Sequence, residues 1–192
     1  MKATLKSIDK ALSYIDGINN GTSNTPFMDM ARVVALLENK SIEDVLAELP
    51  TMAEVLTIYS TDVDLLLEWL KPTNNYITSF EIDGVTYDVC PAELLTPNRV
   101  DLVIQIEAEM ANNKGNVASF QFIADGMASY CYSADEINVQ LETPKLDDEL
   151  HVKNTKEQFM MQYKNRCKLF YEKIDLATAA GVRNFFFQIT KS

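Results

Sequence analysis

The stretch Phe80-Glu81-Ile82-Asp83-Gly84-Val85-Thr86-Tyr87-Asp88-Val89 decides the fold, because it predicts a β-hairpin over about residues 77–90. Asp83-Gly84 suits a two-residue turn of type I′, since that turn needs positive φ at both central positions. The turn sets the pairing of the flanking residues: Ile82 with Val85, Phe80 with Tyr87, Glu81 with Thr86 and Ser79 with Asp88. A lone hairpin is marginal in water. Helices must therefore cover its apolar side, which is made of Phe80, Ile82, Val85, Tyr87 and Val89.

A bundle of short helices is predicted before the hairpin. Apolar residues at three- and four-residue steps mark the first helix, namely Leu5, Ile8, Leu12 and Ile15. Thr25-Pro26 starts a second helix, with Thr25 as its N-cap. The spacing Ser/Thr-x-x-acid predicts three more helix starts, at Ser41 with Asp44, at Thr51 with Glu54 and at Thr61 with Asp64. We expect the fourth helix to end at Tyr59 and the fifth at Leu70, before Lys71-Pro72.

Helices also dominate the chain after the hairpin. We expect them from Thr96-Pro97 through Met110, over Val117 to Tyr132, over about Asn154 to Phe170, and from Asp175 through Ile189. Gly126 costs the second of these helices about 1 kcal/mol relative to Ala, which favours close helix packing at that point. The alternation of Ile137, Val139 and Leu141 with polar residues indicates a short strand.

These elements place the chain in the mainly α, α+β class. The architecture is a bundle of short helices with one β-hairpin and with C-terminal helices packed on it. A chain of 192 residues forms one domain or two small ones. We expect an N-terminal helical subdomain over residues 1–72 and a hairpin-plus-helices subdomain over residues 73–192, or one continuous domain.

Composition and charge narrow the classes of partner. The net charge of −11 disfavours nucleic acid as a direct partner. Residues 1–150 hold 9 Lys and Arg against 25 Asp and Glu, whereas residues 151–192 hold 8 against 3. The basic segment predicts either a solvated helix face closing on an acidic surface or contact with an acidic partner. No run approaches the ~18 apolar residues of a membrane span, and the first 20 residues lack the apolar core of a signal peptide.

No motif in the sequence carries a known chemistry. Cys90, Cys131 and Cys167 are widely spaced and match no metal-ligand pattern, so we expect partly buried thiols. The single histidine, His151, follows the acidic run Asp147-Asp148-Glu149. A surface histidine beside an acidic turn is commoner than a catalytic carboxylate–histidine cluster. We therefore expect no catalytic, cofactor-binding or metal-binding residues.

Two aromatic runs near the C-terminus are the other candidates for function. They are Leu169-Phe170-Tyr171 and Phe185-Phe186-Phe187. Three consecutive phenylalanines on a helix cannot all point one way, since each step turns the helix by about 100°. The last helix is therefore either wedged between two layers of its own core or in contact with another subunit or protein.

The order of the predicted elements along the chain resembles that of a known group of proteins. A bundle of short helices precedes the hairpin, then Leu94-Leu95-Thr96-Pro97 opens a helix that contains Asp101-Leu102, and a late helix bears Asn184-Phe185-Phe186-Phe187. Over about residues 28–189 this resembles small virion and tail-assembly proteins of tailed bacteriophages, especially the crAss-like phages of Bacteroidetes. Pro97 and the strand end at Cys90-Pro91 depart from the pattern of that group.

The resemblance implies a non-enzymatic phage protein that acts through protein–protein contacts. It would be carried in the virion as a portal- or tail-associated or cargo protein, with portal, tail or capsid components as partners and self-association in multiple copies as a further option. An assembly chaperone for a tail protein, not retained in the virion, is the first alternative. A small host-directed regulatory protein, or a hydrolase using carboxylates and His151, is the second. The resemblance carries over no site residue.

Overall fold

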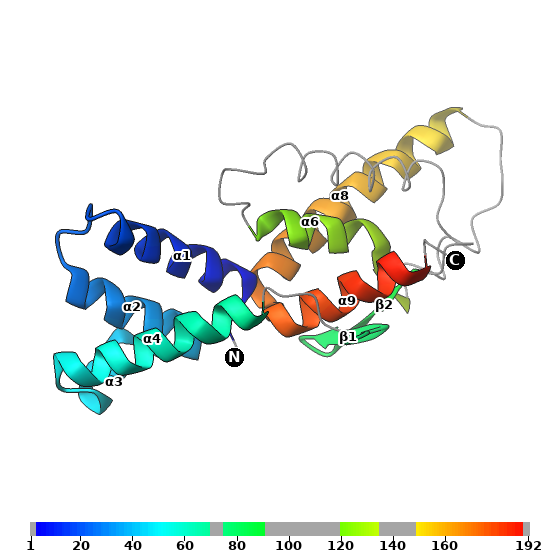
Figure 1. The fold of residues 1–192 in the computed structure, drawn as a ribbon. Helices are drawn as coiled ribbons and strands as arrows, with labels where there is room; N and C mark the ends of the chain where they lie inside the picture. The colour runs from blue at the N-terminus through cyan, green and yellow to red at the C-terminus, as the bar shows by residue number, and fades with distance from the viewer. Residues whose placement is uncertain (1–2, 70–74, 91–119, 135–148, 190–192) are drawn as a thin grey trace. The chain divides into compact units, whose positions relative to one another are not determined.

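The computed structural model describes residues 3–69, 75–90, 120–134 and 149–189 (Figure 1). This part of the chain is mostly helical and contains one small antiparallel sheet, which confirms the predicted α+β class. The chain divides into two compact units. The first comprises Met1–Thr73 with Asp175–Ala177, and the second comprises Asn74–Ile174 with Thr178–Ser192. The return of residues 175–177 to the first unit has no counterpart in the sequence prediction.

The first unit is built around the second of its helices. It contains α1 (Leu5–Asn19), α2 (Pro26–Glu38), α3 (Ile42–Glu48) and α4 (Met52–Trp69) (Figure 1). Helix α2 packs against each of the other three. Its small and branched residues meet one buried valine from α3 and one from α4, in a core made of Ala31, Val34, Ala35, Val45 and Val55. Small residues at these positions let the helix backbones approach closely.

The predicted helix starts are confirmed at α2, α3 and the beginning of α4. Ser41 accepts a hydrogen bond from the Asp44 backbone N–H at 3.0 Å. Thr51 accepts one from the Glu54 backbone N–H at 3.3 Å, and the Glu54 carboxylate accepts the Thr51 backbone N–H at 3.0 Å in return. These reciprocal bonds satisfy N–H groups that have no partner inside the helix. Thr25 makes no side-chain cap, and Pro26 fills the first turn of α2.

The prediction of two separate helices ending at Tyr59 and starting at Thr61 was wrong, because α4 runs without a break from Met52 to Trp69. The Thr61 hydroxyl donates to the carbonyl oxygen of Thr57 at 3.0 Å, one turn back in the same helix. The spacing of Thr61 and Asp64 matched a capping pattern, but no Gly or Pro interrupts the helix there. A threonine inside a helix can bond backwards in this way instead of capping.

The hairpin of the second unit has the predicted turn and register. Strands β1 (Ser79–Ile82) and β2 (Val85–Val89) are antiparallel, and all four predicted residue pairs are present. Asp83 has φ 49° and Gly84 has φ 82°, as a type I′ turn requires. Val85 departs from the expected apolar floor, because it is exposed next to the turn.

A third strand was missed. Residues up to Tyr132 were expected to be helical, but α6 covers Gln121–Tyr130 and is followed directly by β3 (Cys131–Ser133). Strand β3 pairs antiparallel with β2, giving the order β1-β2-β3. This pairing uses the backbone groups of β2 that a two-stranded hairpin would leave open. The expected helix over 96–110 and the expected strand at 137–141 lie outside the described residues.

Aromatic rings join the hairpin to the long helix α8 (Glu149–Lys173). The rings of Phe80 and Tyr87 stack across the two strands with centroids 5.7 Å apart. The buried ring of Phe170 meets both edge-on, at 5.4 Å and 5.1 Å. Aromatic pairs in such geometries are stabilising beyond the area that they bury. Phe170 therefore covers the apolar side of the hairpin, as the sequence predicted for a C-terminal helix.

The close approach expected at Gly126 occurs at a different glycine. Among the described residues, a Cβ atom placed on Gly126 would meet nothing within 4 Å outside its own helix, so no described neighbour shows the expected close approach there. Gly181 in α9 (Leu176–Ile189) is the tight position: a Cβ on it would lie 2.7 Å from Cδ1 and Cγ1 of Ile77. The Ile77 backbone N–H also donates to the Gly181 carbonyl oxygen at 3.1 Å. The segment before β1 thus lies directly on the α9 backbone.

Candidate functional site

The residues first considered for chemistry do not form a described cluster. Glu149 and His151 belong to the first turn of α8, and Asp147 and Asp148 lie outside the described residues. Among the described residues, no group of three or more His, Cys, Asp or Glu side chains is placed to hold a metal ion.

The three cysteines are free thiols that are buried or half-buried. Cys90 and Cys131 are buried and Cys167 is half-buried. Burial raises the pKa of the Cys131 thiol well above its usual value. Burial, offset in part by a hydrogen bond involving Tyr163, raises the pKa of Cys167 to about 12. Because the thiolate is the reactive form, these environments disfavour nucleophilic chemistry.

A buried arginine forms a hydrogen bond with the C-terminal turn of α6 in the second unit. The Arg166 Nε–H of α8 donates to the Ala128 carbonyl oxygen at 3.1 Å, in the last turn of α6. Its guanidinium lies over the Tyr132 ring, 4.7 Å from the centroid. A positive charge at a helix C-terminus complements the helix dipole, and stacking on an aromatic ring adds to this. Arg166 therefore has a structural role in joining α6, β3 and α8.

The aromatic runs are in part accounted for inside the second unit. Phe170 is fully buried under the hairpin, and Phe185 is half-buried on α9. The side chains of Phe186 and Phe187 are not among those described. The described part of these runs thus points to a core position, the first of the two interpretations of the sequence.

Helix α4 carries an exposed apolar strip on one border of its buried side. Val55 and Leu66 are buried, whereas Met52, Leu56 and Leu67 are 61%, 43% and 55% exposed. At about 100° per residue, these last three fall within about 60° of one another on the helix surface. We call Met52, Leu56 and Leu67 the α4 flank. The half-buried Tyr59 and Val63 lie on the same side of the helix between Leu56 and Leu67.

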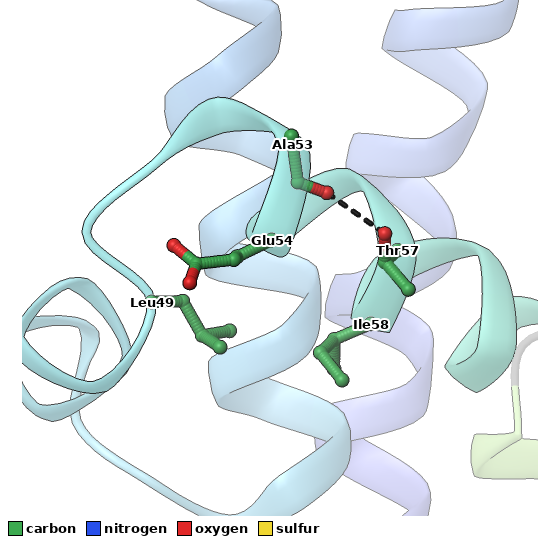
Figure 2. A pocket seen from close by; sticks show the side chains of 5 residues that line it. All are labelled: Leu49, Ala53, Glu54, Thr57 and Ile58. Carbon is green, nitrogen blue, oxygen red and sulfur yellow. Dashed lines mark hydrogen bonds between the residues drawn. The ribbon is translucent and has the colours of Figure 1, made fainter.

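A hollow lies beside Leu49 on the exposed face of the first two turns of α4. Figure 2 shows the side chains that line this pocket, which are Leu49, Ala53, Glu54, Thr57 and Ile58. The pocket is open to solvent and has a volume of about 260 Å³. Leu49 follows α3, and the other four residues come from the first two turns of α4. The pocket is smaller than the roughly 300–1,000 Å³ of typical small-molecule sites. Its size and its open form suit one apolar side chain of a partner better than a free ligand.

The apolar surface of α4 covers a wider angle around the helix than its buried surface does. From the exposed Leu65, across the buried Val55 and Leu66, to Leu67, the apolar arc covers roughly 200° of the helix surface. A helix at the surface of a globular protein needs an apolar stripe of only ~100° to face its core. Both borders of the arc therefore remain in water in this structure.

All charged residues of the segment that contains α3 and α4 are acidic. Residues 41–69 contain seven Asp and Glu and no Lys or Arg. Glu48 is paired with Lys40 at 2.7 Å, and Lys40 also contacts Glu38 at 2.9 Å. Asp64 and Glu68 form no ion pair within the described ranges, and Asp64 is exposed. The exposed side of α4 thus combines apolar strips with uncompensated negative charge.

One acid of α4 is buried. Asp62 is 9% exposed, and its Oδ2 atom has no hydrogen-bond partner in the part of the chain that the structure describes. Burial, and then the negative charge of Glu38, raise the pKa of Asp62 to about 6. The buried Asp29 of α2 is the contrasting case. It accepts a hydrogen bond from Ser23 at 2.6 Å and pairs with Arg32, and its pKa is lowered, first of all by the Ser23 bond.

Comparisons with known proteins add no family. No protein-family model, no curated protein and no solved structure matches this chain. Among the helices of the described residues, none combines the length and the apolar character needed to cross a membrane.

The α4 flank was missed from the sequence for a specific reason. The expected break between Tyr59 and Thr61 assigned Leu56 and Leu67 to different helices, so their common face could not be seen. Read as one helix over 52–69, the sequence does contain the signal. Met52, Leu56 and Leu67 are then four and eleven residues apart, which is the spacing of one helix face.

Proposed function

We propose that this chain is a non-enzymatic bacteriophage structural or assembly protein that is carried in the virion and binds another phage protein through α4. The observation that supports a binding role is the apolar arc of α4, which is wider than the face it buries. The phage setting, the virion location and the portal, tail or capsid partners rest on the sequence resemblance alone.

The exposed apolar surface of the α4 flank is large enough to form one part of an interface, but not a whole interface. Fully burying a Leu or Met side chain contributes about 1.5–3 kcal/mol. Covering the exposed halves of Met52, Leu56 and Leu67 therefore contributes a few kcal/mol before the costs of association are subtracted. Further contacts, such as an apolar side chain entering the pocket at Leu49 and Ile58, would add to this.

The virion assignment is tested by mass spectrometry of purified particles and of assembly intermediates. We expect the chain in mature particles at a fixed ratio to the portal or tail proteins. Presence in intermediates but not in mature particles would assign it as an assembly chaperone instead. Absence from both would refute the phage structural role.

The binding role of α4 is tested by the double variant Leu56→Gln/Leu67→Gln. Glutamine keeps the helix propensity close to that of leucine and removes the apolar surface. We expect unchanged thermal stability and at least tenfold less chain incorporated into particles or retained by its partner. Met161→Gln is the matched control, because it removes an equally exposed apolar side chain from α8. Equal loss in the two variants would show that α4 is not the binding surface.

A further inference from the structure

We propose that the partner segment docking on α4 is a basic amphipathic helix. Its apolar residues would cover the α4 flank, and its Lys or Arg residues would face Asp64 and Glu68. This inference rests on the proposed function and adds the chemistry of the partner to it.

The charge of this surface favours a basic partner. The segment 41–69 presents seven acids and no base, so an acidic or neutral partner would leave several carboxylates facing like charge or losing water without compensation. A basic segment would bring opposite charge to each of them. Such complementarity also speeds the encounter of two partners and excludes wrong ones.

The position of Asp64 and Glu68 also favours a basic partner. Asp64 and Glu68 are four residues apart and form a row along the helix beside the α4 flank. Asp64 lies one turn before Leu67, about 60° around the helix from it. Two other acids of this region are already engaged: Glu48 binds Lys40 at 2.7 Å, and Glu54 accepts the Thr51 backbone N–H at 3.0 Å. The negative charge of Asp64 and Glu68 therefore lies next to the exposed apolar strip.

The form of the surface favours a helical partner. Met52 to Leu67 extend over about 22 Å of helix, at about 1.5 Å per residue. A straight apolar strip of that length on a helix accepts the apolar face of another helix, with anchors at i, i+4, i+7 and i+11. Asp64 and Glu68, beside this strip, then face the polar side of the incoming helix.

The test uses three fluorescein-labelled synthetic peptides of sixteen residues and the full chain. The first has Leu at i, i+4, i+7 and i+11 with Lys at the polar positions. The second keeps the Leu pattern with Glu in place of Lys, and the third keeps Lys with Ser in place of Leu. Fluorescence anisotropy should show that the Lys/Leu peptide binds at least tenfold more tightly than either other peptide. Its affinity should fall as salt is raised.

Charge-reversed variants locate the contact. In Asp64→Lys/Glu68→Lys the preference should reverse in favour of the Glu/Leu peptide. Asp16→Lys/Glu81→Lys is the matched control, because it changes the net charge equally at exposed acids of α1 and β1 that lie outside residues 41–69. The control should retain the preference of the parent. A reversal of equal size in both variants would mean that only net charge matters, and would overturn the inference.

The outcomes separate this inference from the proposed function. Equal binding of the two Leu peptides, lost in Leu56→Gln/Leu67→Gln, would overturn the charge argument and leave the α4 binding role intact. Binding that does not change in Leu56→Gln/Leu67→Gln would overturn both. No binding of any peptide would overturn the basic-helix inference, while particle incorporation would still decide the function.

Sedimentation of the protein alone completes the test. We expect a monomer at micromolar concentration in both the parent and Asp64→Lys/Glu68→Lys. An oligomer of the parent that dissociates in this variant would show that a second copy covers α4, with its own basic surface, and would overturn the assignment to a separate partner.

Discussion

Asp62 is a buried carboxyl group whose charge opposes folding. Its pKa is raised from 3.8 to about 6, first by burial and then by Glu38. Because the folded value lies above the unfolded value, the stabilisation is complete below pH ~4 and is lost as the pH rises through ~6. We expect Asp62→Asn to be roughly 1–3 kcal/mol more stable than the parent near neutral pH, and the two to converge toward pH ~4. Urea unfolding at a series of pH values measures this.

Asp64→Asn is the matched control for this prediction. It makes the same change two residues away on α4, at an exposed carboxylate. Its stability should stay within about 0.5 kcal/mol of the parent at every pH. If Asp62→Asn behaved in the same way, Asp62 would be charged at no cost in the folded protein, through contacts that the described residues do not provide.

Gly84 holds the hairpin turn at a positive φ of 82°. A Cβ atom there would meet nothing within 4 Å, so a substitution changes the backbone energy and not the packing. We expect Gly84→Val to lower the free energy of unfolding by roughly 1–3 kcal/mol, because a β-branched residue strongly disfavours this conformation. Gly84→Asn should cost clearly less, since asparagine tolerates it. Equal melting temperatures for these two variants would contradict the turn geometry.

At the level of elements, Thr51 and Thr61 have the same local sequence pattern and opposite roles. Thr51 caps α4, whereas Thr61 lies inside it and bonds back to Thr57. We expect Thr51→Ala to destabilise the protein by about 1 kcal/mol, and Thr61→Ala to be neutral or slightly stabilising. Chemical denaturation of the two variants gives the comparison. A loss at Thr61 as large as that at Thr51 would indicate a helix start at residue 61.

Gly126 of α6 and Gly181 of α9 allow a second comparison of two similar substitutions. A methyl group on Gly126 meets no atom of the described residues within 4 Å, while one on Gly181 meets the Ile77 side chain at 2.7 Å. Gly126→Ala should stabilise the protein by about 0.5–1 kcal/mol through helix propensity. Gly181→Ala should destabilise it by roughly 1–3 kcal/mol, because the crowded atoms must move. Adding Ile77→Ala should restore part of that loss, and differential scanning calorimetry would detect this coupling.

The elements also differ in how far the sequence could predict them. The hairpin was predicted to the exact pairing because Asp83-Gly84 fixes the register locally. Strand β3 is three residues long and owes its conformation to pairing with β2, more than 40 residues earlier in the sequence. No local pattern in Cys131–Ser133 announces that contact. The close approach at Gly181 is likewise a tertiary fact, since it depends on Ile77.

At the level of the whole molecule, the acidic net charge leads us to expect no direct binding of nucleic acid. With a net charge of −11, we expect no shift of duplex DNA or single-stranded RNA in gel retardation at about 0.15 M salt. A basic DNA-binding domain serves as the positive control. A salt-sensitive complex would show that the positive charge of residues 151–192 acts independently of the acidic remainder.

The candidate site could be predicted less well than the fold. Its apolar character and its acids are plain in the sequence of residues 41–69. The extent of burial decides which apolar residues stay exposed, and that extent depends on how α2 and α3 pack against α4. Equally, it is packing that leaves Asp62 Oδ2 without a hydrogen-bond partner among the described residues. Such properties belong to the assembled unit and not to a local pattern.

The bridge between Thr4 and Asp175 determines when the first unit can be completed during synthesis of the chain. The first unit includes residues 175–177, with the buried Leu176, so its last component leaves the ribosome roughly 100 residues after Thr73. At ~5–20 residues per second, the nascent N-terminal helices wait about 5–20 s for it. During that interval the apolar groups that Leu176 later covers stay open to chaperones. A nonsense mutation after residue 173 would thus damage the beginning of the protein as well as its end.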